Sequence, residues 1–174
     1  MTPEELIAEY TLIHAKSGVM DGNSTRKRRD EIWGFINRVK PQTVLDYGCG
    51  KAGHYLRSEL HKFWGIEMPT LYDPAVEGFM EKPQGKFDAV ICVDVMEHIH
   101  PSEVLKTLDE VMNYSKAVFF NIATKPALKS FKNGTNFHTT IKPRGWWRAE
   151  IDKRSNNHNI EIYFDEEKEP RRKT

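Results

Sequence analysis

The stretch "TVLDYGCGKAGHY", residues 43–55, decides the fold. Apolar residues run without alternation into Asp46, and the chain then bends through two glycines that flank Cys49. A short apolar run of this kind is typical of a strand buried on both faces of a parallel sheet. Glycines allow positive φ angles and close approach of a ligand to the backbone. The stretch therefore predicts a strand, a ligand-binding loop and then a helix over residues 52–63.

The chain on either side repeats the strand and helix pattern. Apolar residues at helical spacing predict helices over 4–16, 26–40 and 101–114, and a last helix is expected to begin at Pro143. Strands are expected at 70–73, 87–94, 117–123 and 159–164. The last of these alternates like an edge strand. Over 26–40, the expected buried face is Ile32, Trp33, Ile36 and Val39. This rhythm predicts βαβ units, and hence an α/β fold with a mostly parallel sheet.

Length and composition indicate a soluble chain with one domain. The sequence has 174 residues, 39% of them apolar, and a net charge of +1. We expect a single domain over 1–165, made of N-terminal helices (1–40), a ligand-binding core (43–123) and a substrate-side region (124–165), with a flexible tail at 166–174. The acidic, polar N-terminus is unlike a signal peptide, and only two cysteines are present. A cytoplasmic location with reduced thiols is therefore expected.

The carboxylate at the first turn separates this loop from phosphate-binding loops. An acid at the position of Asp46 would repel pyrophosphate, and "GKA" at 50–52 lacks the Ser or Thr of a Walker motif. The ligand expected near Asp46 is cationic and not heavily phosphorylated. In an open α/β sheet, it would lie beyond the carboxyl ends of the strands.

These features resemble the class I S-adenosylmethionine-dependent methyltransferases. The matching segments are "VLDYGCGKAG", "TLYDPAV" and "FDAVICVDVMEHI", in that order. The resemblance implies a three-layer Rossmann-like fold. The segment between Asp73 and Phe87 is too short for a full helix and strand, so the fold should be reduced around the third strand. The wider layout is similar to small methyltransferases of bacteria and their phages.

The resemblance also implies which residues hold the cofactor. The positions expected to line S-adenosylmethionine are Asp46, Tyr47, Gly48, Gly50, Asp73 and Asp94. Apart from the resemblance, the N-terminal stretch "YTLIHAKSG" could fold over the cofactor, with His14 or Tyr10 contacting it. Asp46 and the glycines would meet the methionine end, and Asp73 the ribose hydroxyls. Glu67 is the rival of Asp73 for the ribose. Asp94 would lie near the adenine or the transferred methyl group.

Two histidines are candidates for the catalytic base, because imidazole titrates near neutral pH. His98 follows the 87–94 strand, and His138 lies in the polar loop after the 117–123 strand. Asp94, Glu97 and His98 also resemble the D/E-x-x-E-H spacing with which some ubiquinone-biosynthesis O-methyltransferases hold a divalent cation. One histidine with two acids is a weak metal signature. A site without metal is therefore expected, and a cation is the alternative.

The function expected is methyl transfer from S-adenosylmethionine to an oxygen or nitrogen of a small-molecule or glycan-like acceptor. Nucleic-acid methylation is an alternative, since the basic segments "RKRR", "KPALKSFK" and "KPRGWWR" combine charge with stackable rings. Trp146 and Trp147 cannot both face the core, so one of them could line the acceptor pocket. A non-catalytic cofactor-binding module is the other alternative, because methyl transfer requires no universal side chain.

Overall fold

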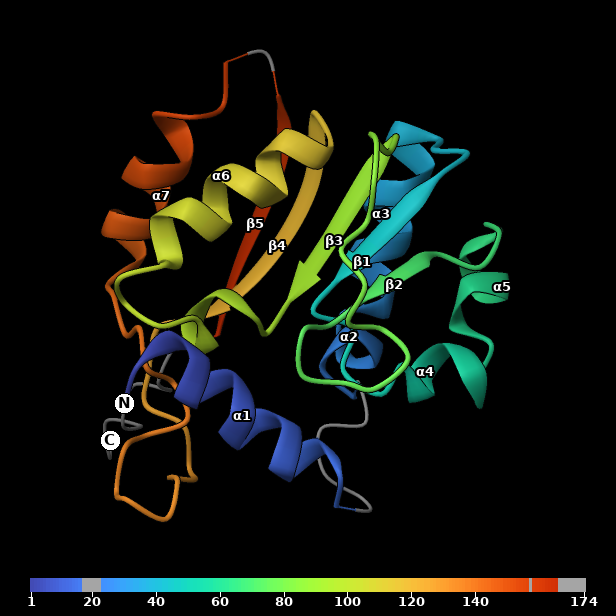
Figure 1. Ribbon diagram of the computed structural model, residues 1–174. Coiled ribbons are helices and arrows are strands. Elements are labelled where there is room, and N and C mark those ends of the chain that lie inside the picture. The colour runs from blue at the N-terminus through green and yellow to red at the C-terminus, as the bar shows by residue number, and fades with distance from the viewer. Residues whose placement is uncertain (17–22, 157, 166–174) are drawn as a thin grey trace, which may run out of the picture.

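The computed structural model describes residues 1–16, 23–156 and 158–165. Its centre is a five-stranded sheet in the order β2-β1-β3-β4-β5, and every pairing is parallel. The strands are β1 (Val44–Tyr47), β2 (Thr70–Tyr72), β3 (Ala89–Val93), β4 (Ala117–Ala123) and β5 (Asn159–Asp165). Because all strands run the same way, their carboxyl ends meet at a single edge of the sheet (Figure 1).

Helices cover both faces of the sheet and its carboxyl edge. They are α1 (Pro3–His14), α2 (Asn23–Lys27), α3 (Arg29–Val39), α4 (Gly53–Leu56), α5 (Leu60–Trp64), α6 (Val104–Tyr114), α7 (Arg144–Asp152) and the 3-10 turn η1 (Met96–His98). In Figure 1, α6 and α7 lie on one face and α3 on the other, while α1 crosses beyond the strand ends. None of the helices within the described ranges is long and apolar enough to cross a membrane.

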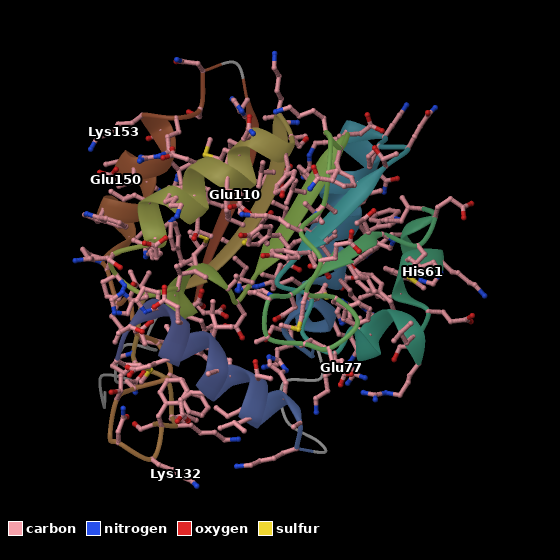
Figure 2. The ribbon with its side chains drawn as sticks, viewed as in Figure 1. His61, Glu77, Glu110, Lys132, Glu150 and Lys153 are labelled. Atoms are coloured by element: carbon pink, nitrogen blue, oxygen red, sulfur yellow. The ribbon has the colours of Figure 1, made fainter. Side chains whose placement is uncertain are left out.

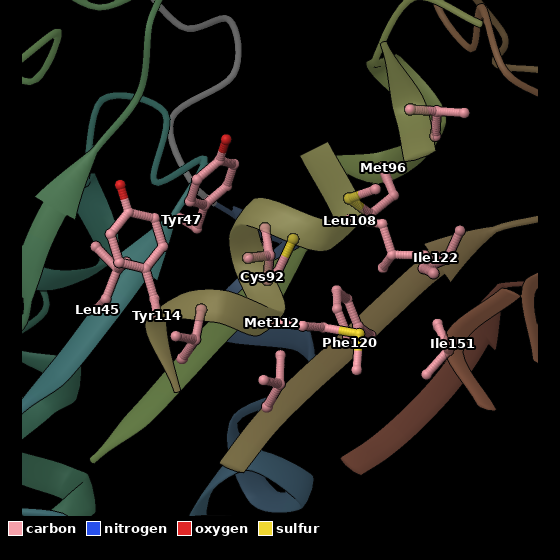
Figure 3. Close-up of a cluster of buried hydrophobic side chains, with 14 of the residues drawn as sticks. Leu45, Tyr47, Cys92, Met96, Leu108, Met112, Tyr114, Phe120, Ile122 and Ile151 are labelled. Atoms are coloured by element: carbon pink, nitrogen blue, oxygen red, sulfur yellow. The ribbon is translucent and has the colours of Figure 1, made fainter. Parts of the chain in front are cut away.

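Two apolar clusters bind these layers to the sheet. On the α6 and α7 face, Phe120 and its neighbours pack against Leu108 and Ile151 (Figure 3). On the opposite face, Phe119 packs with Phe35 of α3. Adjacent residues of one strand thus serve opposite faces, as the two-residue period of a strand requires. The predicted three-layer Rossmann-like α/β fold is confirmed.

The predicted reduction around the third strand is also confirmed. Between β2 and β3, residues 73–88 contain no helix or strand, and β2 therefore forms one edge of the sheet. The strand expected at 159–164 is the opposite edge, β5. Between the helices expected at 4–16 and 26–40, part of the chain falls outside the described residues, and residues 23–25 belong to α2. The predicted tail lies wholly outside the described residues.

Two local predictions were wrong. Trp33 is 48% exposed, and Phe35 takes its place in the core beside Ile32 and Ile36. Trp33 lies one position, about 100°, around the helix from Ile32, so it points away from the buried stripe. The single helix expected over 52–63 is two short helices, α4 and α5, separated by a turn in which Glu59 has a φ of 47°.

Candidate functional site

A cavity of about 580 Å³ lies at the carboxyl ends of β1, β2 and β3. Its wall includes the glycine loop after β1, Asp73 after β2 and Asp94 after β3. Helix α1 supplies Tyr10 and His14 to the same wall. This is the position at which open α/β sheets bind ligands, because loops of adjacent strands diverge there.

The glycine loop is fixed by backbone hydrogen bonds to β2. Gly48 N and Cys49 N donate to the Tyr72 carbonyl at 2.7 and 3.1 Å, and Gly50 N donates to Asp73 Oδ2 at 2.9 Å. Gly48 has a φ of 81°, in the left-handed region. A Cβ at this position would lie 2.3 Å from Val95 Cγ2, so only glycine fits there without movement.

Asp73 connects the glycine loop to the next turn. Its Oδ1 accepts a hydrogen bond from Ala75 N at 2.9 Å, in addition to the bond from Gly50. Burial raises the pKa of Asp73 above its ordinary value, against the lowering effect of the two backbone donors and of His14. Glu67, the rival for the ribose, is exposed and precedes β2, whereas Asp73 follows it. Only Asp73 of the two lines the cavity.

His14 stands on the cavity wall close enough to Asp73 for their charges to interact. Burial lowers its pKa, and the Asp73 carboxylate opposes that effect. The buried Nδ1 of His14 has no hydrogen-bond partner among the described residues. A ligand in the cavity could therefore satisfy this nitrogen.

Asp46 does not line the cavity, and the structure does not support the expected direct contact with a cofactor. Its side chain is 2% exposed, and Oδ2 lies 3.2 Å from Nε2 of the equally buried His54 of α4. The reason is strand alternation: Leu45 and Tyr47 face the α6 side, so Asp46 faces the α3 side with Val44. Asp46 thus lies behind the glycine loop.

Asp94 points into the cavity from a strained backbone position. Its φ is 60°, unusual for a residue with a side chain, and such strain concentrates at functional sites. Its Oδ2 accepts a 2.7 Å hydrogen bond from Ser24 Oγ. Burial opposes ionisation of Asp94, but His98, Glu97 and Ser24 together outweigh it and lower the pKa below the ordinary value.

His98 is held by α1 and by the loop after β4. Tyr10 Oη donates to the Phe137 carbonyl at 2.6 Å, and His98 Nδ1 lies 2.8 Å from Tyr10 Oη and 3.2 Å from that carbonyl. Since the Tyr10 proton is used on the carbonyl, Nδ1 of His98 carries a hydrogen and Nε2 keeps its lone pair. Burial lowers the pKa of His98 to about 4, so the ring is neutral at physiological pH.

His138 does not line the cavity, but it packs against His98. Their ring centres are 4.8 Å apart with an edge-to-face orientation. The Lys125 carbonyl lies 2.6 Å from His138 Nδ1, and because a carbonyl can only accept, Nδ1 of this ring carries the hydrogen. The two candidate histidines are thus brought together, each with Nε2 available as an acceptor.

Comparison with known proteins identifies the family to which this chain belongs. Residues 23–161 match the protein family described as Methyltransferase domain. The chain belongs to this family. It is a class I methyltransferase, and domains of this type typically bind S-adenosylmethionine. No curated protein and no solved structure matches the sequence.

The methyltransferase cavity is rich in carboxylates, of which the sequence motifs at the strand ends indicate only Asp73 and Asp94. Among the described residues, five acids and two lysines line it: Glu4, Asp73, Asp94, Glu103 and Glu110 against Lys82 and Lys106. Sequence reasoning missed Glu110, which α6 presents (Figure 2) and which accepts hydrogen bonds from Tyr47 Oη at 3.1 Å and Lys82 Nζ at 2.6 Å. An amphipathic helix next to a binding strand is the signal that could have indicated it.

Some residues of the basic segments make contacts within the methyltransferase itself. Arg28 of "RKRR" is hydrogen-bonded to Asp165 and Glu31. In the last helix, Trp147 is fully buried, and Arg148 lies over the Phe164 ring. Trp146, partly buried, has Lys142 over its ring and is not part of the cavity wall. These contacts occupy two of the arginines and both tryptophans, whereas Arg26, Lys27, Lys129 and Lys132 are exposed.

Proposed function

We propose that this methyltransferase transfers the methyl group of S-adenosylmethionine to an oxygen or nitrogen of a small-molecule or glycan-like acceptor. The observation that carries the proposal is the glycine loop opening onto a cavity whose described lining holds five carboxylates and two lysines. S-adenosylmethionine carries a sulfonium and an ammonium group, and a carboxylate-rich site favours such a cation electrostatically. The cavity volume lies in the range of small-molecule sites.

The proposed placement of the cofactor follows the strand ends. Gly48 and Gly50 would hold the methionine portion, Asp73 would accept from the ribose hydroxyls, and His14 would contact the cofactor from α1. Asp94, next along the sheet, would lie near the transferred methyl group. Tyr47 would form part of the wall with its ring. Asp46 would act indirectly, by holding α4 behind the loop through His54.

The reaction needs alignment more than side-chain chemistry. The sulfonium supplies the driving force, and the protein orients the acceptor in line with the methyl carbon. A hydroxyl acceptor also needs a proton acceptor, and Nε2 of His98 at the cavity wall is the candidate. Its pKa of about 4 keeps the ring neutral and able to accept, although as a weaker base than free imidazole. His138 would support it by contact from behind.

A pair of matched variants tests the cofactor site. Asp73→Asn removes the charge and one strong acceptor, and it should weaken binding of S-adenosylhomocysteine at least ~10-fold, since hydrogen bonds to charged groups contribute about 1.5–3 kcal/mol. Glu67→Gln is the control, because this acid is exposed and precedes the strand. Isothermal titration should show unchanged affinity for the control, and urea unfolding should show that both variants are folded. If the wild type binds neither cofactor nor product at millimolar concentration, the proposal fails.

Transfer of label from methyl-labelled S-adenosylmethionine tests catalysis separately. A fraction of small metabolites should accept label in the presence of wild-type protein. Label found on nucleic acid instead would favour the basic segments as the acceptor surface. Cofactor binding without transfer to any fraction would favour a binding module.

A further inference from the structure

Four potential metal ligands from three segments converge beside the cavity. Asp94 follows β3, Glu97 and His98 belong to η1, and His138 comes from the loop after β4. One ligand atom from each lies within 4.8 Å of all the others. In a tetrahedral site with bonds of 2.0–2.2 Å, ligand atoms are about 3.4 Å apart, so side-chain movements of about 1 Å would close this cluster around an ion.

Both imidazoles have the Nδ1 hydrogen-bonding pattern that is common among metal-binding histidines. Nδ1 of His98 is turned to the Phe137 carbonyl, and Nδ1 of His138 to the Lys125 carbonyl. Histidines that bind metal typically donate one ring N–H to a carbonyl or carboxylate, which fixes the tautomer and directs the other nitrogen to the ion. Here both rings keep Nε2 unprotonated.

Glu97 provides an independent indication. Its side chain is fully buried, Oε1 accepts from Ala123 N at 2.7 Å, and Oε2 has no hydrogen-bond partner among the described residues. A buried carboxylate oxygen without a partner is costly unless something binds it. Without an ion, Glu97 can lie beside the Asp94 carboxylate only by carrying a proton directed at it. A cation between Glu97 and Asp94 would take the place of that proton and would neutralise both acids.

We propose that Asp94, Glu97, His98 and His138 bind a divalent first-row transition metal ion of the zinc class. His138 decides the class of ion, because two imidazoles with two carboxylates suit zinc, iron, cobalt or nickel, whereas magnesium and calcium select oxygen ligands. No spacing in the sequence indicates His138, which lies 40 residues beyond His98. The site revises the expectation of a metal-free centre.

The ion would be accessible from the cavity, since Asp94 and His98 also form part of its wall. On the proposed function, an acceptor oxygen could bind the ion there, and the ion would then assist loss of its proton as a Lewis acid. In that case the two imidazoles would serve as ligands and not as bases, and the proton of the acceptor would pass to solvent. Metal binding itself does not depend on the methyl-transfer reaction.

The test uses the full chain stripped with a chelator and titrated with Co²⁺ as a spectroscopic probe, followed by Zn²⁺. One equivalent of Co²⁺ should bind with visible absorption bands, and one equivalent of Zn²⁺ should displace it. Millimolar Mg²⁺ should not. His138→Gln should lower the Zn²⁺ affinity by at least ~10- to 100-fold, the loss typical when even an outer-shell partner is removed. Glu97→Gln, which retains the acceptor for Ala123 N, should do the same.

His158→Gln is the matched control, because His158 lies just before β5, has its ring nitrogens beside the carbonyls of Asn156 and Met112, and is not one of the four potential ligands. Its Zn²⁺ affinity should equal that of the wild type. Substoichiometric binding, or an equal loss in His138→Gln and His158→Gln, would overturn the metal site. Titration of the stripped protein with S-adenosylhomocysteine separates the two proposals. Cofactor binding without metal binding overturns only this one, and metal binding without cofactor binding overturns only the proposed function.

Discussion

Gly48 offers the sharpest test of how the cofactor loop is built. Gly48→Ala adds a methyl group at a φ of 81°, where the new Cβ would lie 2.3 and 2.9 Å from the two γ-carbons of Val95. The left-handed backbone costs about 1–2 kcal/mol for a residue with a side chain. Overpacking against Val95 adds about 1–3 kcal/mol. The expected loss in free energy of unfolding is therefore about 2–5 kcal/mol.

Two companion variants separate the backbone and packing contributions. Gly78→Ala also places alanine at a positive φ, 90°, but its Cβ meets nothing within 4 Å. It should cost only the backbone part, about 1–2 kcal/mol. In a Val95→Ala background, Gly48→Ala loses the two shortest contacts and keeps only Val95 Cβ at 3.2 Å. Its cost there should approach that of Gly78→Ala.

Urea unfolding followed by tryptophan fluorescence measures all five proteins: the wild type, Gly48→Ala, Gly78→Ala, Val95→Ala and the double variant. Their dependence on urea is compared to confirm two-state behaviour. The double-mutant cycle should give a coupling of about 1–3 kcal/mol between positions 48 and 95. Additive costs would refute the steric argument. Equal costs for Gly48→Ala and Gly78→Ala in the wild-type background would show that Val95 moves aside freely.

Three further predictions follow from buried or paired groups. Asp46→Ala should lower the free energy of unfolding by about 1–3 kcal/mol, because it leaves buried His54 Nε2 without its partner. A change below about 0.5 kcal/mol in urea unfolding, roughly the size of a surface effect, would contradict a stabilising contact between Asp46 and His54. Burial raises the thiol pKa values of Cys49 and Cys92, so iodoacetamide at pH 8 should label neither in the native protein and both in denaturant, as mass spectrometry can count. Hydrogen bonds from Thr43 and Gln42 lower the pKa of Asp88 below its ordinary 3.8. The stabilising effect of Asp88 is therefore present above pH 3.8 and is lost as the pH falls through the folded-state pKa. The difference in free energy of unfolding between wild type and Asp88→Ala should shrink in acid, and a constant difference from pH 6 to 3 would disprove this prediction.

The sheet was predictable because parallel strands buried on both faces leave a strong signal. Residues 117–123 are apolar except for Asn121, and the structure buries every one of them. The loop after β1 was predictable for a similar reason, since two glycines around one residue have few structural uses at a strand end. In both cases the decisive interactions are local or depend only on burial.

Directions of side chains were harder to predict, even where the chain carried the signal. Asp46 was taken as a cavity residue from its motif, although the two-residue period of β1 sets it on the face opposite to Tyr47. The break between α4 and α5 has a comparable cause. Tyr55 and Leu60 are both buried but lie five positions apart, and an unbroken helix would rotate them about 140° from one another. The turn at Glu59 brings both to the core.

Convergence of His138 with His98 required the folded chain, because three segments distant in sequence create it. Tyr10 of α1 donates to the Phe137 carbonyl, and that carbonyl in turn orients His98. The ring of Tyr10 also packs on Phe131 and Phe137, which anchors the loop after β4 to α1. The helix that covers the cavity therefore also sets the spacing of the two imidazoles. Any ligand that moves α1 should change the geometry of the four-ligand cluster. Binding of the cofactor and binding of the metal ion should therefore be thermodynamically coupled. By reciprocity, each should alter the affinity of the protein for the other by the same factor.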